Sequence, residues 1–475
     1  MQSGRRQWVA LGFLADVALF ELGYFIAFWL RFPHRVPPQN LSPFLHVLPY
    51  STLLTMGVFW AYEPYLYGWQ RLRDCLTTVI LAVTLANAGN MALTYWLRDF
   101  AIPRTVFLLA AVIQVVVLLS WRSLRQAIQV KTGGALKLVV VGEADVSTIL
   151  DRVKENYGGP VRLVGAYKGD DDFEEAEDDL AQADAVYFAA ADPSERQGKI
   201  MSWCLAHDKT IYLVPNTYDI MLQGAVKTHL GDQPLFYIEG LSLSPGQRLA
   251  KRAEDLLLAA ILAAGAVVVT PFIALAIKLT SPGPVFYRQE RVGRDGRRFY
   301  IYKFRTMVDG AERRTGAILA SENDPRITPV GRFLRATRLD EVPQVLNVLK
   351  GEMSFVGPRP ERPEFVERFM QAIPAYVYRF KVKPGITGLA QVRGNYSTEA
   401  ADKLRYDLYY IRNWSLLLDL RIIFQTLWVV LRPDAASGLR GRAGGELVKA
   451  ASNSGGQNWK SGPTGGQRAL EPEQS

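Results

Sequence analysis

Long apolar runs dominate the first quarter of the chain. They cover residues 8–30, 44–62, 76–97 and 106–121, and an apolar stretch of about 20 residues is long enough to cross a bilayer as a helix. Basic residues gather before the first run and after the second and fourth, which favours a cytoplasmic N-terminus. The pattern predicts a membrane protein with a four-helix transmembrane bundle over residues 1–130.

Two acidic residues, Asp16 and Glu21, lie inside the first apolar run. A charged group within a membrane helix faces the protein interior or marks a polar pathway. We interpret both as packing or positioning residues of the bundle, with a polar pathway as the alternative.

The pattern changes over residues 131–245. Short apolar runs at 137–142, 162–167, 185–189 and 210–214 are separated by helical stretches, a pattern typical of a parallel α/β sheet. Only Gly142 follows the first run, where a dinucleotide-binding loop needs three glycines. The sequence predicts a Rossmann-like α/β module without an intact dinucleotide loop, and we expect no bound dinucleotide.

A fifth apolar run, at residues 253–279, has positive charges at both ends and contains Thr270 and Pro271. Proline removes a backbone donor and disturbs the preceding turn of a helix. We predict a re-entrant membrane helix over residues 246–280, broken at Thr270-Pro271, that enters and leaves through one leaflet. A kinked spanning helix is the alternative.

The last segments are amphipathic and then polar. Residues 401–431 mix aromatic residues and leucines with charges, a composition that suits interfacial amphipathic helices, whereas residues 433–475 are rich in Gly, Ser and Gln. We expect the latter to form a disordered tail.

Composition narrows the functional classes. The chain has 475 residues, a formal charge of +9 and two distant cysteines, Cys75 and Cys204, so neither a disulfide framework nor a cysteine metal site is expected. No cleavable signal peptide is evident. No nucleic-acid-binding motif accompanies the positive charge, which points instead to phosphate substrates or anionic lipid.

The candidate chemistry centres on an adjacent carboxylate pair, Asp340 and Glu341. Apolar spacing predicts a helix over residues 342–349, and Pro343 suits its first turn, so the pair should lie at the helix N-terminus. The alternative is that Asp340 only caps the helix.

Cations surround this pair in the sequence. Residues 281–393 hold 21 Lys and Arg against 12 Asp and Glu, a net charge of +9 that equals the charge of the whole chain. Lys303 and Arg305 should share one strand face. Other candidate phosphate ligands are Arg326, Arg338 and Arg359. A carboxylate pair among arginines suits a Mg²⁺-assisted site for phosphate esters, and a solvated basic face near anionic lipid is the alternative.

Several ordered motifs between residues 250 and 432 resemble those of the bacterial polyprenyl-phosphate hexose-1-phosphate transferases. These are the large monotopic phosphoglycosyl transferases that initiate O-antigen, capsule and exopolysaccharide synthesis. The motifs are Ser281-Pro282-Gly283-Pro284, Tyr302-Lys303-Phe304-Arg305, Leu339-Asp340-Glu341, Val356-Gly357-Pro358-Arg359-Pro360 and Lys383-Pro384-Gly385.

The resemblance implies a reaction and roles for these residues. Asp340 would attack the sugar-bearing phosphate of a UDP-hexose, releasing UMP, and the aspartyl phosphosugar would pass to polyprenyl phosphate. Asp340 and Glu341 would bind Mg²⁺. Lys303, Arg305, Arg326 and Arg338 would hold phosphates, with a structural ion-pair role as the alternative for Arg305. Pro358, Arg359 and Pro360 would lie at the nucleotide end.

The resemblance also implies a location, which is the bacterial inner membrane with a small α/β catalytic domain at residues 281–432 on the cytoplasmic face. It further suggests a re-entrant helix and a possible homodimer. The hexose stays open, because Ala390 stands where many members have tryptophan.

Two alternatives stay open, and a third lacks the motif that it would need. The carboxylates could bind only Mg²⁺ while the lipid phosphate attacks the UDP-sugar directly, or the chain could be a non-catalytic scaffold for polysaccharide assembly. A nucleotide-sugar dehydratase or epimerase would need a tyrosine with a lysine four residues later, and the chain has none.

Overall fold

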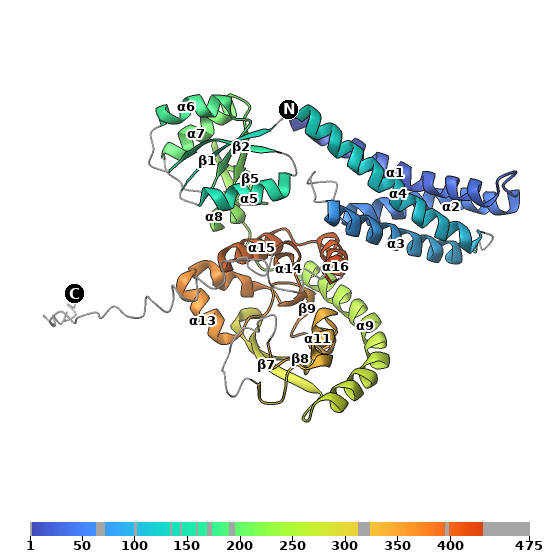
Figure 1. The fold of residues 1–475 in the computed structure, drawn as a ribbon. Helices are drawn as coiled ribbons and strands as arrows, with labels where there is room; N and C mark the ends of the chain where they lie inside the picture. The colour runs from blue at the N-terminus through green and yellow to red at the C-terminus, as the bar shows by residue number, and fades with distance from the viewer. Residues whose placement is uncertain are drawn as a thin grey trace.

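The computed structural model describes residues 2–62, 72–98, 102–133, 135–142, 145–157, 160–168, 173–189, 195–311, 324–394 and 399–430. It has an N-terminal group of long helices, an α/β module and a C-terminal domain (Figure 1). The predicted tail at residues 433–475 lies outside the described residues.

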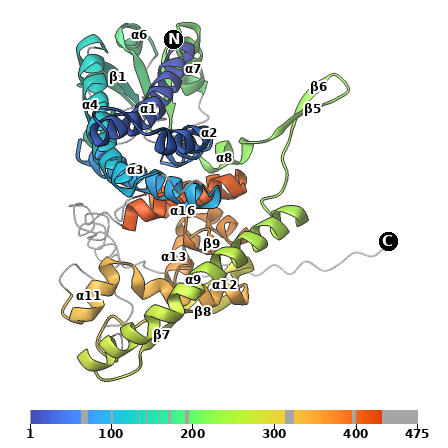
Figure 2. The same cartoon turned by 90° about the vertical axis from the view of Figure 1, so that its right-hand side faces the viewer.

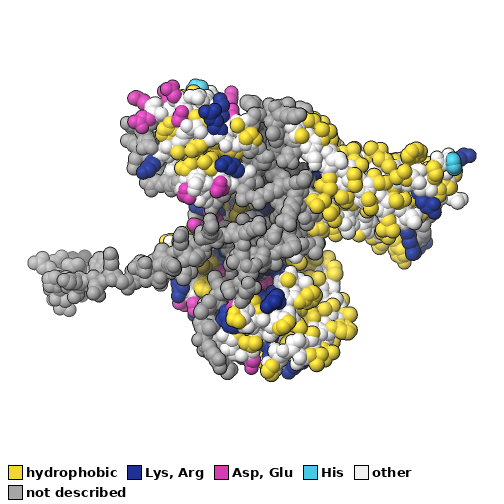
Figure 3. Space-filling view, in the orientation of Figure 1, with side chains coloured by type: hydrophobic (Ala, Val, Ile, Leu, Met, Phe, Trp, Pro, Cys, Tyr) yellow, Lys and Arg dark blue, Asp and Glu magenta, His cyan; other side chains and the backbone are white. Residues whose placement is uncertain are grey.

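The N-terminal helices are α1 (Gln2–Arg31), α2 (Pro38–Ala61), α3 (Leu72–Trp96) and α4 (Arg104–Gly133). Among the described residues, these helices and α9 (Pro245–Thr280) are long and apolar enough to cross a membrane by length and composition. Aromatic side chains such as Phe20, Tyr24 and Phe59 form a shared core for the first four. Hydrophobic side chains also cover much of their outer surface (Figure 3), as a lipid-facing surface requires.

Polar groups inside this helical core are paired across helix interfaces. Asp16 lies 3.1 Å from a guanidinium nitrogen of Arg122, and the Ser51 hydroxyl donates to Glu21 at 3.0 Å. Because an unpaired polar group is costly inside an apolar bundle, these contacts favour the packing interpretation of Asp16 and Glu21.

The α/β module confirms the predicted parallel sheet. Its strands are β1 (Leu136–Val141), β2 (Val161–Tyr167), β3 (Ala185–Phe188) and β4 (Thr210–Leu213), in the order β2-β1-β3-β4. Helix α5 (Val146–Tyr157) packs on one face, and α6 (Phe173–Gln182) and α7 (Glu195–Ala206) pack on the other. The predicted strands agree with the observed ones to within one residue.

The N-terminus of α5, where a dinucleotide phosphate would bind in an intact fold, carries a side chain of its own chain. The Asp145 carboxylate accepts hydrogen bonds from the backbone and hydroxyl of Ser147 and from the Thr148 hydroxyl. These bonds hold the pKa of Asp145 below its ordinary value. The positive end of the α5 dipole therefore already interacts with the Asp145 carboxylate.

A short linker follows the module. It contains α8 (Thr217–Leu222) and an antiparallel hairpin of β5 (Val226–Leu230) and β6 (Gln233–Tyr237), which the sequence pattern did not predict. The hairpin projects away from the rest of the structure (Figure 2). Ile220 of α8 instead packs into the core of the C-terminal domain, so α8 ties the linker to that domain.

Helix α9 begins with a capping box between Ser244 and Gln247 and runs without interruption to Thr280. The prediction of a helix break at Thr270-Pro271 is therefore wrong, because both residues lie inside one continuous helix. Proline removes a single intrahelical hydrogen bond, and a helix absorbs this loss by bending. The helix follows a curved path with the C-terminal domain in its concavity (Figure 1).

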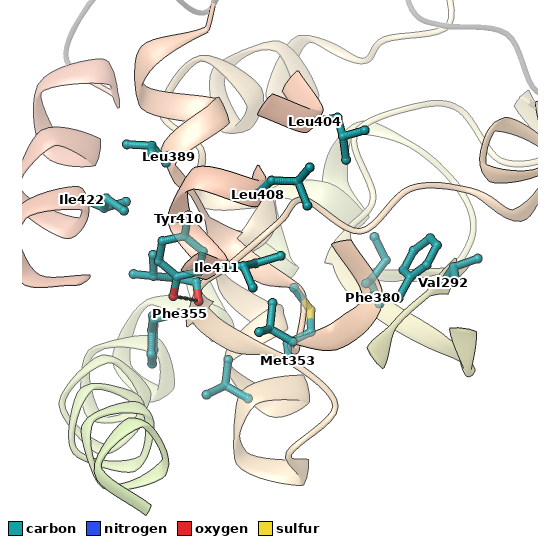
Figure 4. Close-up of a cluster of buried hydrophobic side chains, with 14 of the residues drawn as sticks. Val292, Met353, Phe355, Phe380, Leu389, Leu404, Leu408, Tyr410, Ile411 and Ile422 are labelled. Atoms are coloured by element: carbon teal, nitrogen blue, oxygen red, sulfur yellow. Dashed lines mark hydrogen bonds between the residues drawn. The ribbon is translucent and has the colours of Figure 1, made fainter. Parts of the chain in front are cut away.

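The C-terminal domain begins with an antiparallel pair, β7 (Phe286–Val292) and β8 (Arg298–Phe304), joined through the short turn η1 (Arg294–Gly296). The elements that follow are α11 (Pro329–Ala336), η2 (Leu339–Gln344), α12 (Val345–Lys350), β9 (Ser354–Val356), α13 (Pro363–Ala372), η3 (Pro374–Lys381), β10 (Gly385–Thr387), α14 (Leu389–Arg393), α15 (Ala400–Arg412) and α16 (Leu416–Val430). Figure 4 shows how side chains from these elements, including Met353, Phe380 and Leu408, meet in one core.

The predicted amphipathic segment forms α15 and α16. Leu404, Leu408 and Ile411 of α15 are buried in the domain core, whereas α16 keeps leucines such as Leu417 and Leu420 exposed. Only α16 therefore presents an apolar surface of the kind expected for an interfacial helix.

The first turns of α9 are bonded to elements beside the carboxylate pair. Asp255 accepts from the hydroxyl of Ser354 at 2.8 Å and from the backbone of Phe355 at 2.9 Å. Arg252 donates to the carbonyls of Val348 and Leu349 at 2.7 and 2.8 Å. These bonds fix β9 and the C-terminus of α12 on the apolar helix.

Strands β9 and β10 are parallel, and glycines allow the chain segments around them to approach closely. A Cβ atom on Gly385 would lie 2.1 Å from the backbone nitrogen of Gly357 and 2.3 Å from the carbonyl of Thr387. Both clashes are with backbone, which cannot rotate away as a side chain can. Glycine is therefore required at this crossing.

We expect Gly385→Ala to lower the free energy of unfolding by about 1–3 kcal/mol or more, as overpacking in a close-packed interior does. The matched control is Gly198→Ala in α7, where a Cβ meets nothing within 4 Å; it should be neutral or slightly stabilising because alanine favours helix. Thermal unfolding of both variants in detergent tests this, and equal melting temperatures would contradict it.

Candidate active site

Asp340 and Glu341 lie in the 3₁₀ turn η2, and α12 begins only at Val345. The predicted helix start at residue 342 is therefore wrong by three residues. Arg338, in the left-handed conformation at φ 58°, turns the chain just before the pair, and residues other than glycine rarely adopt that conformation. The N-cap of α12 is Gln344 and that of α11 is Thr328, so Asp340 does not act as a helix cap.

Glu341 is bound by two cations. The Lys303 ammonium lies 2.7 Å from its Oε1, and the Arg359 guanidinium donates to the same oxygen at 3.1 Å. Burial alone would raise the pKa of Glu341, but Lys303 and Arg359 outweigh it and hold that pKa well below the ordinary 4.5. Glu341 is thus an ionised carboxylate whose charge is compensated within the protein.

Asp340 differs from its neighbour. It is 9% exposed, and among the described residues no side chain or backbone group donates a hydrogen bond to its carboxylate. Burial raises the pKa of Asp340; the charges of Lys303, Arg335 and Arg338 oppose this rise, and Glu341 adds to it. Within the described part of the site, the charge of Glu341 is thus compensated by two cations, whereas the Asp340 carboxylate accepts no hydrogen bond and lies in the field of Lys303, Arg335 and Arg338.

Two of the predicted phosphate ligands have other partners. Arg305 lies one residue past β8 and donates to the carbonyls of Ser281 and Pro282 at 2.8 and 2.7 Å. Arg326 binds Asp324 at 2.6 Å. Lys303 and Arg305 therefore do not act together on the carboxylate pair, because the strand ends between them and Arg305 turns to the end of α9. Their roles as phosphate ligands stay predictions.

The segment Pro358-Arg359-Pro360 is fixed by its backbone. The nitrogen of Gly385 donates to the carbonyl of Pro358 at 2.9 Å, and Arg291 donates to that of Pro360 at 3.1 Å. Arg359 itself is 37% exposed along its side chain while contacting Glu341. A fixed backbone thus presents an accessible guanidinium group beside the carboxylate pair.

Sequence reasoning missed two cations near this segment, Arg291, which is largely buried, and Arg379, which is almost fully buried. Arg291 lies close to Arg359, and burial together with that neighbouring charge lowers the pKa of Arg291 to about 10. Arg379, in η3, donates to the carbonyl of Arg359 at 2.9 Å. The bonds that connect Arg291 and Arg379 to this segment span 69 and 20 positions in the sequence, so local patterns do not reveal them.

The residues at this site fit a Mg²⁺ ion that is held by one carboxylate together with substrate phosphates. Within the described part of the chain, no group of three or more His, Cys, Asp or Glu could hold a metal by itself. Mg²⁺ is commonly held by one or two carboxylates together with substrate phosphates and water. Asp340 can supply such a ligand, whereas Oε1 of Glu341 is already bound by Lys303 and Arg359.

Comparison with known proteins identifies the family. Residues 246–433 match the model for bacterial sugar transferases. A Caulobacter vibrioides UDP-glucose:undecaprenyl-phosphate glucose-1-phosphate transferase is 44% identical over 196 residues, which are 40% of this chain and 72% of that protein. The chain belongs to the bacterial sugar transferase family.

Two longer relatives have different sugars in their names. The Escherichia coli UDP-glucose:undecaprenyl-phosphate glucose-1-phosphate transferase is 42% identical over 46% of this chain and 48% of its own length. The Aeromonas hydrophila UDP-N-acetylgalactosamine-undecaprenyl-phosphate N-acetylgalactosaminephosphotransferase is 45% identical over 44% and 50%. The match thus spans about half the length of these relatives.

We expect Glu341→Gln to lower the free energy of unfolding at pH 7 by about 2 kcal/mol, because two cations lose a charged partner. Since the folded-state pKa of Glu341 lies below 4.5, its contribution is complete above that pH and is lost as the pH falls through the folded value. The difference from wild type should narrow below pH 4.5 in denaturant titrations. A difference that grows on acidification would contradict the assignment.

Proposed function

We propose that this protein transfers a hexose 1-phosphate from a UDP-hexose to polyprenyl phosphate in two displacements at Asp340. The observation that carries the proposal is the asymmetry of the carboxylate pair, in which Glu341 binds Lys303 and Arg359 while Asp340 accepts no hydrogen bond among the described residues. Relatives named for transfer of a sugar phosphate to undecaprenyl phosphate support it.

In the first step a carboxylate oxygen of Asp340 attacks the sugar-bearing phosphorus. An oxygen–phosphorus bond forms, the bond from that phosphorus to the bridging oxygen breaks, and UMP leaves with the electron pair. An ionised neighbour would normally repel the incoming diphosphate. Lys303 and Arg359 remove this obstacle by compensating the charge of Glu341.

In the second step a phosphate oxygen of the polyprenyl acceptor attacks the same phosphorus. The bond to Asp340 breaks, the carboxylate is regenerated, and the product is a polyprenyl diphosphate sugar. Arg335 and Arg338, whose charges act on Asp340, can hold the phosphates during both steps. A bound Mg²⁺ held by Asp340 and the diphosphate would supply neutralisation of charge on the phosphate oxygens.

The membrane arrangement is part of the proposal. Helices α1–α4 would form a transmembrane bundle, and the curved α9 would enter and leave the cytoplasmic leaflet, placing the C-terminal domain on the cytoplasmic face of the bacterial inner membrane. Helix α9 has exposed apolar residues, such as Leu257, Val267 and Phe272, and these support its contact with lipid. A homodimer stays a prediction from the family resemblance.

We expect a phosphohexose adduct on the peptide that contains Asp340 when the protein is incubated with Mg²⁺ and a UDP-hexose before lipid is added. Mass spectrometry with a panel of UDP-sugars would detect the adduct and the released UMP, and would also identify the sugar. Asp340→Asn should abolish the adduct and lower turnover by at least about 10³-fold, because the nucleophile is lost.

The matched control is Asp295→Asn, which removes an exposed carboxylate from the turn η1 of the same domain and should retain the adduct. Turnover without an adduct would indicate direct attack by the lipid phosphate. Absence of turnover with every sugar and acceptor would favour the scaffold.

We expect single cysteines placed at Ser242 and Arg297, exposed positions before and after α9, to react with a membrane-impermeant maleimide from the same side of the membrane. The native Cys75 and Cys204 are replaced first. Labelling intact and opened cells compares these sites with His34→Cys, an exposed position between α1 and α2 that should react from the opposite side. Opposite labelling of Ser242 and Arg297 would establish a spanning α9.

A further inference from the structure

The segment Pro358-Arg359-Pro360 rests on a buried ion pair that does not itself reach the carboxylate pair. Arg379 of η3 is 5% exposed and Asp407 of α15 is 2% exposed. The Asp407 carboxylate lies 2.8 Å from one terminal nitrogen of the Arg379 guanidinium and accepts from its Nε at 3.1 Å. Both contacts are made by the same carboxylate oxygen, Oδ2, so two nitrogens of the guanidinium group are held by one buried charge.

Both terminal nitrogens of Arg379 have further partners. One terminal nitrogen donates to the Tyr376 hydroxyl, and the other, besides contacting Asp407, donates to the carbonyl of Arg359 at 2.9 Å. Burial raises the pKa of Tyr376 beyond its ordinary value, so this hydroxyl is neutral and able to accept. Both terminal nitrogens therefore have a defined partner, and one of these partners, the Arg359 carbonyl, belongs to the segment 358–360.

The bond to the Arg359 carbonyl connects the core to the site. The backbone of Arg359 is held by Arg379 on its own carbonyl, and its side chain reaches Glu341 at 3.1 Å. A shift of this backbone would move the guanidinium group away from the carboxylate, leaving Lys303 as the only described cation within 4.0 Å of it.

We propose that Arg379 and Asp407 are positioning residues that act through Arg359. They keep the Arg359 guanidinium group in contact with Glu341 and so keep the charge of Glu341 compensated. A diphosphate can then approach the neighbouring Asp340 without repulsion from Glu341. The inference rests on the proposed function and adds a step to it. Arg379 touches no reacting group. Its effect on the reaction is transmitted by a single backbone hydrogen bond.

A lysine cannot replace Arg379 in this role. Its ammonium is a single point of charge without the planar fork that binds Asp407, Tyr376 and the Arg359 carbonyl together. Asp407→Asn leaves the guanidinium in place but removes the charge that orients it. These two variants disturb the same pair from opposite sides, and the second keeps the size of the side chain.

The test is a double-mutant cycle between Arg379→Lys and Arg359→Gln, measured as kcat/KM for the UDP-sugar on full-length protein in detergent. Each single variant should lower kcat/KM about tenfold to a hundredfold, as small misplacements in an active site do. If Arg379 acts through Arg359, the double variant should be no slower than the slower single variant. Asp407→Asn should show the same non-additivity with Arg359→Gln.

Asp419→Asn provides the matched control. Asp419 is 0% exposed and binds Lys251 at 2.7 Å in the same domain, without a contact to the segment 358–360. Its effect should multiply with that of Arg359→Gln. Melting temperatures identify a variant that fails to fold, and the cycle through Asp407→Asn then decides the outcome.

The results separate the two proposals. A wild-type protein without transferase activity on any UDP-sugar overturns the proposed function itself. An active wild type in which Arg379→Lys and Asp407→Asn both multiply with Arg359→Gln overturns the positioning inference alone, because the ion pair would then contribute only to general stability.

Discussion

Compensation of the Glu341 charge is the interaction on which the site depends. A carboxylate next to another carboxylate in a buried turn is unfavourable unless positive charge is supplied at close range. Here Lys303 comes from β8 and Arg359 from the segment after β9, and both meet Oε1 of Glu341. Three separate parts of the domain must fold against one another before this arrangement exists.

Contacts around the site hold together the segments that carry Lys303, Glu341 and Arg359. Asp255 and Arg252 of α9 fix β9 and the end of α12, and close glycine contacts hold β9 to β10. The α16 hydroxyl of Thr426 lies 2.6 Å from that of Thr387 at the end of β10. The apolar helix and the charged turn thus belong to one packed unit, which suits the proposed reaction between a soluble nucleotide sugar and a lipid phosphate.

Local patterns in the sequence predicted the features that depend on neighbouring residues. Short apolar runs located the four parallel strands to within one residue, and long apolar runs located the long helices. The same reasoning misplaced the start of α12, because the left-handed Arg338 and the 3₁₀ turn are stabilised by surrounding packing rather than by periodicity. The contact between Arg379 and Asp407 spans 28 positions in the sequence and has no local signature. The bonds from Arg305 to Pro282 and Ser281 span 23 and 24 positions and likewise became clear only from the fold.

The buried lysine of α9 sets an order of events during synthesis. Lys251 reaches its carboxylate partner Asp419 across 168 positions in the sequence, a separation that a ribosome covers in on the order of 10 to 30 s. During that interval α9 has already left the exit tunnel, but α16 has not yet been made. Lys251 therefore has no contact with its partner Asp419 at this stage. If α9 inserts into the membrane early, its first turns must therefore stay in water. The charged start of α9 can be buried in the domain only after α16 has been made.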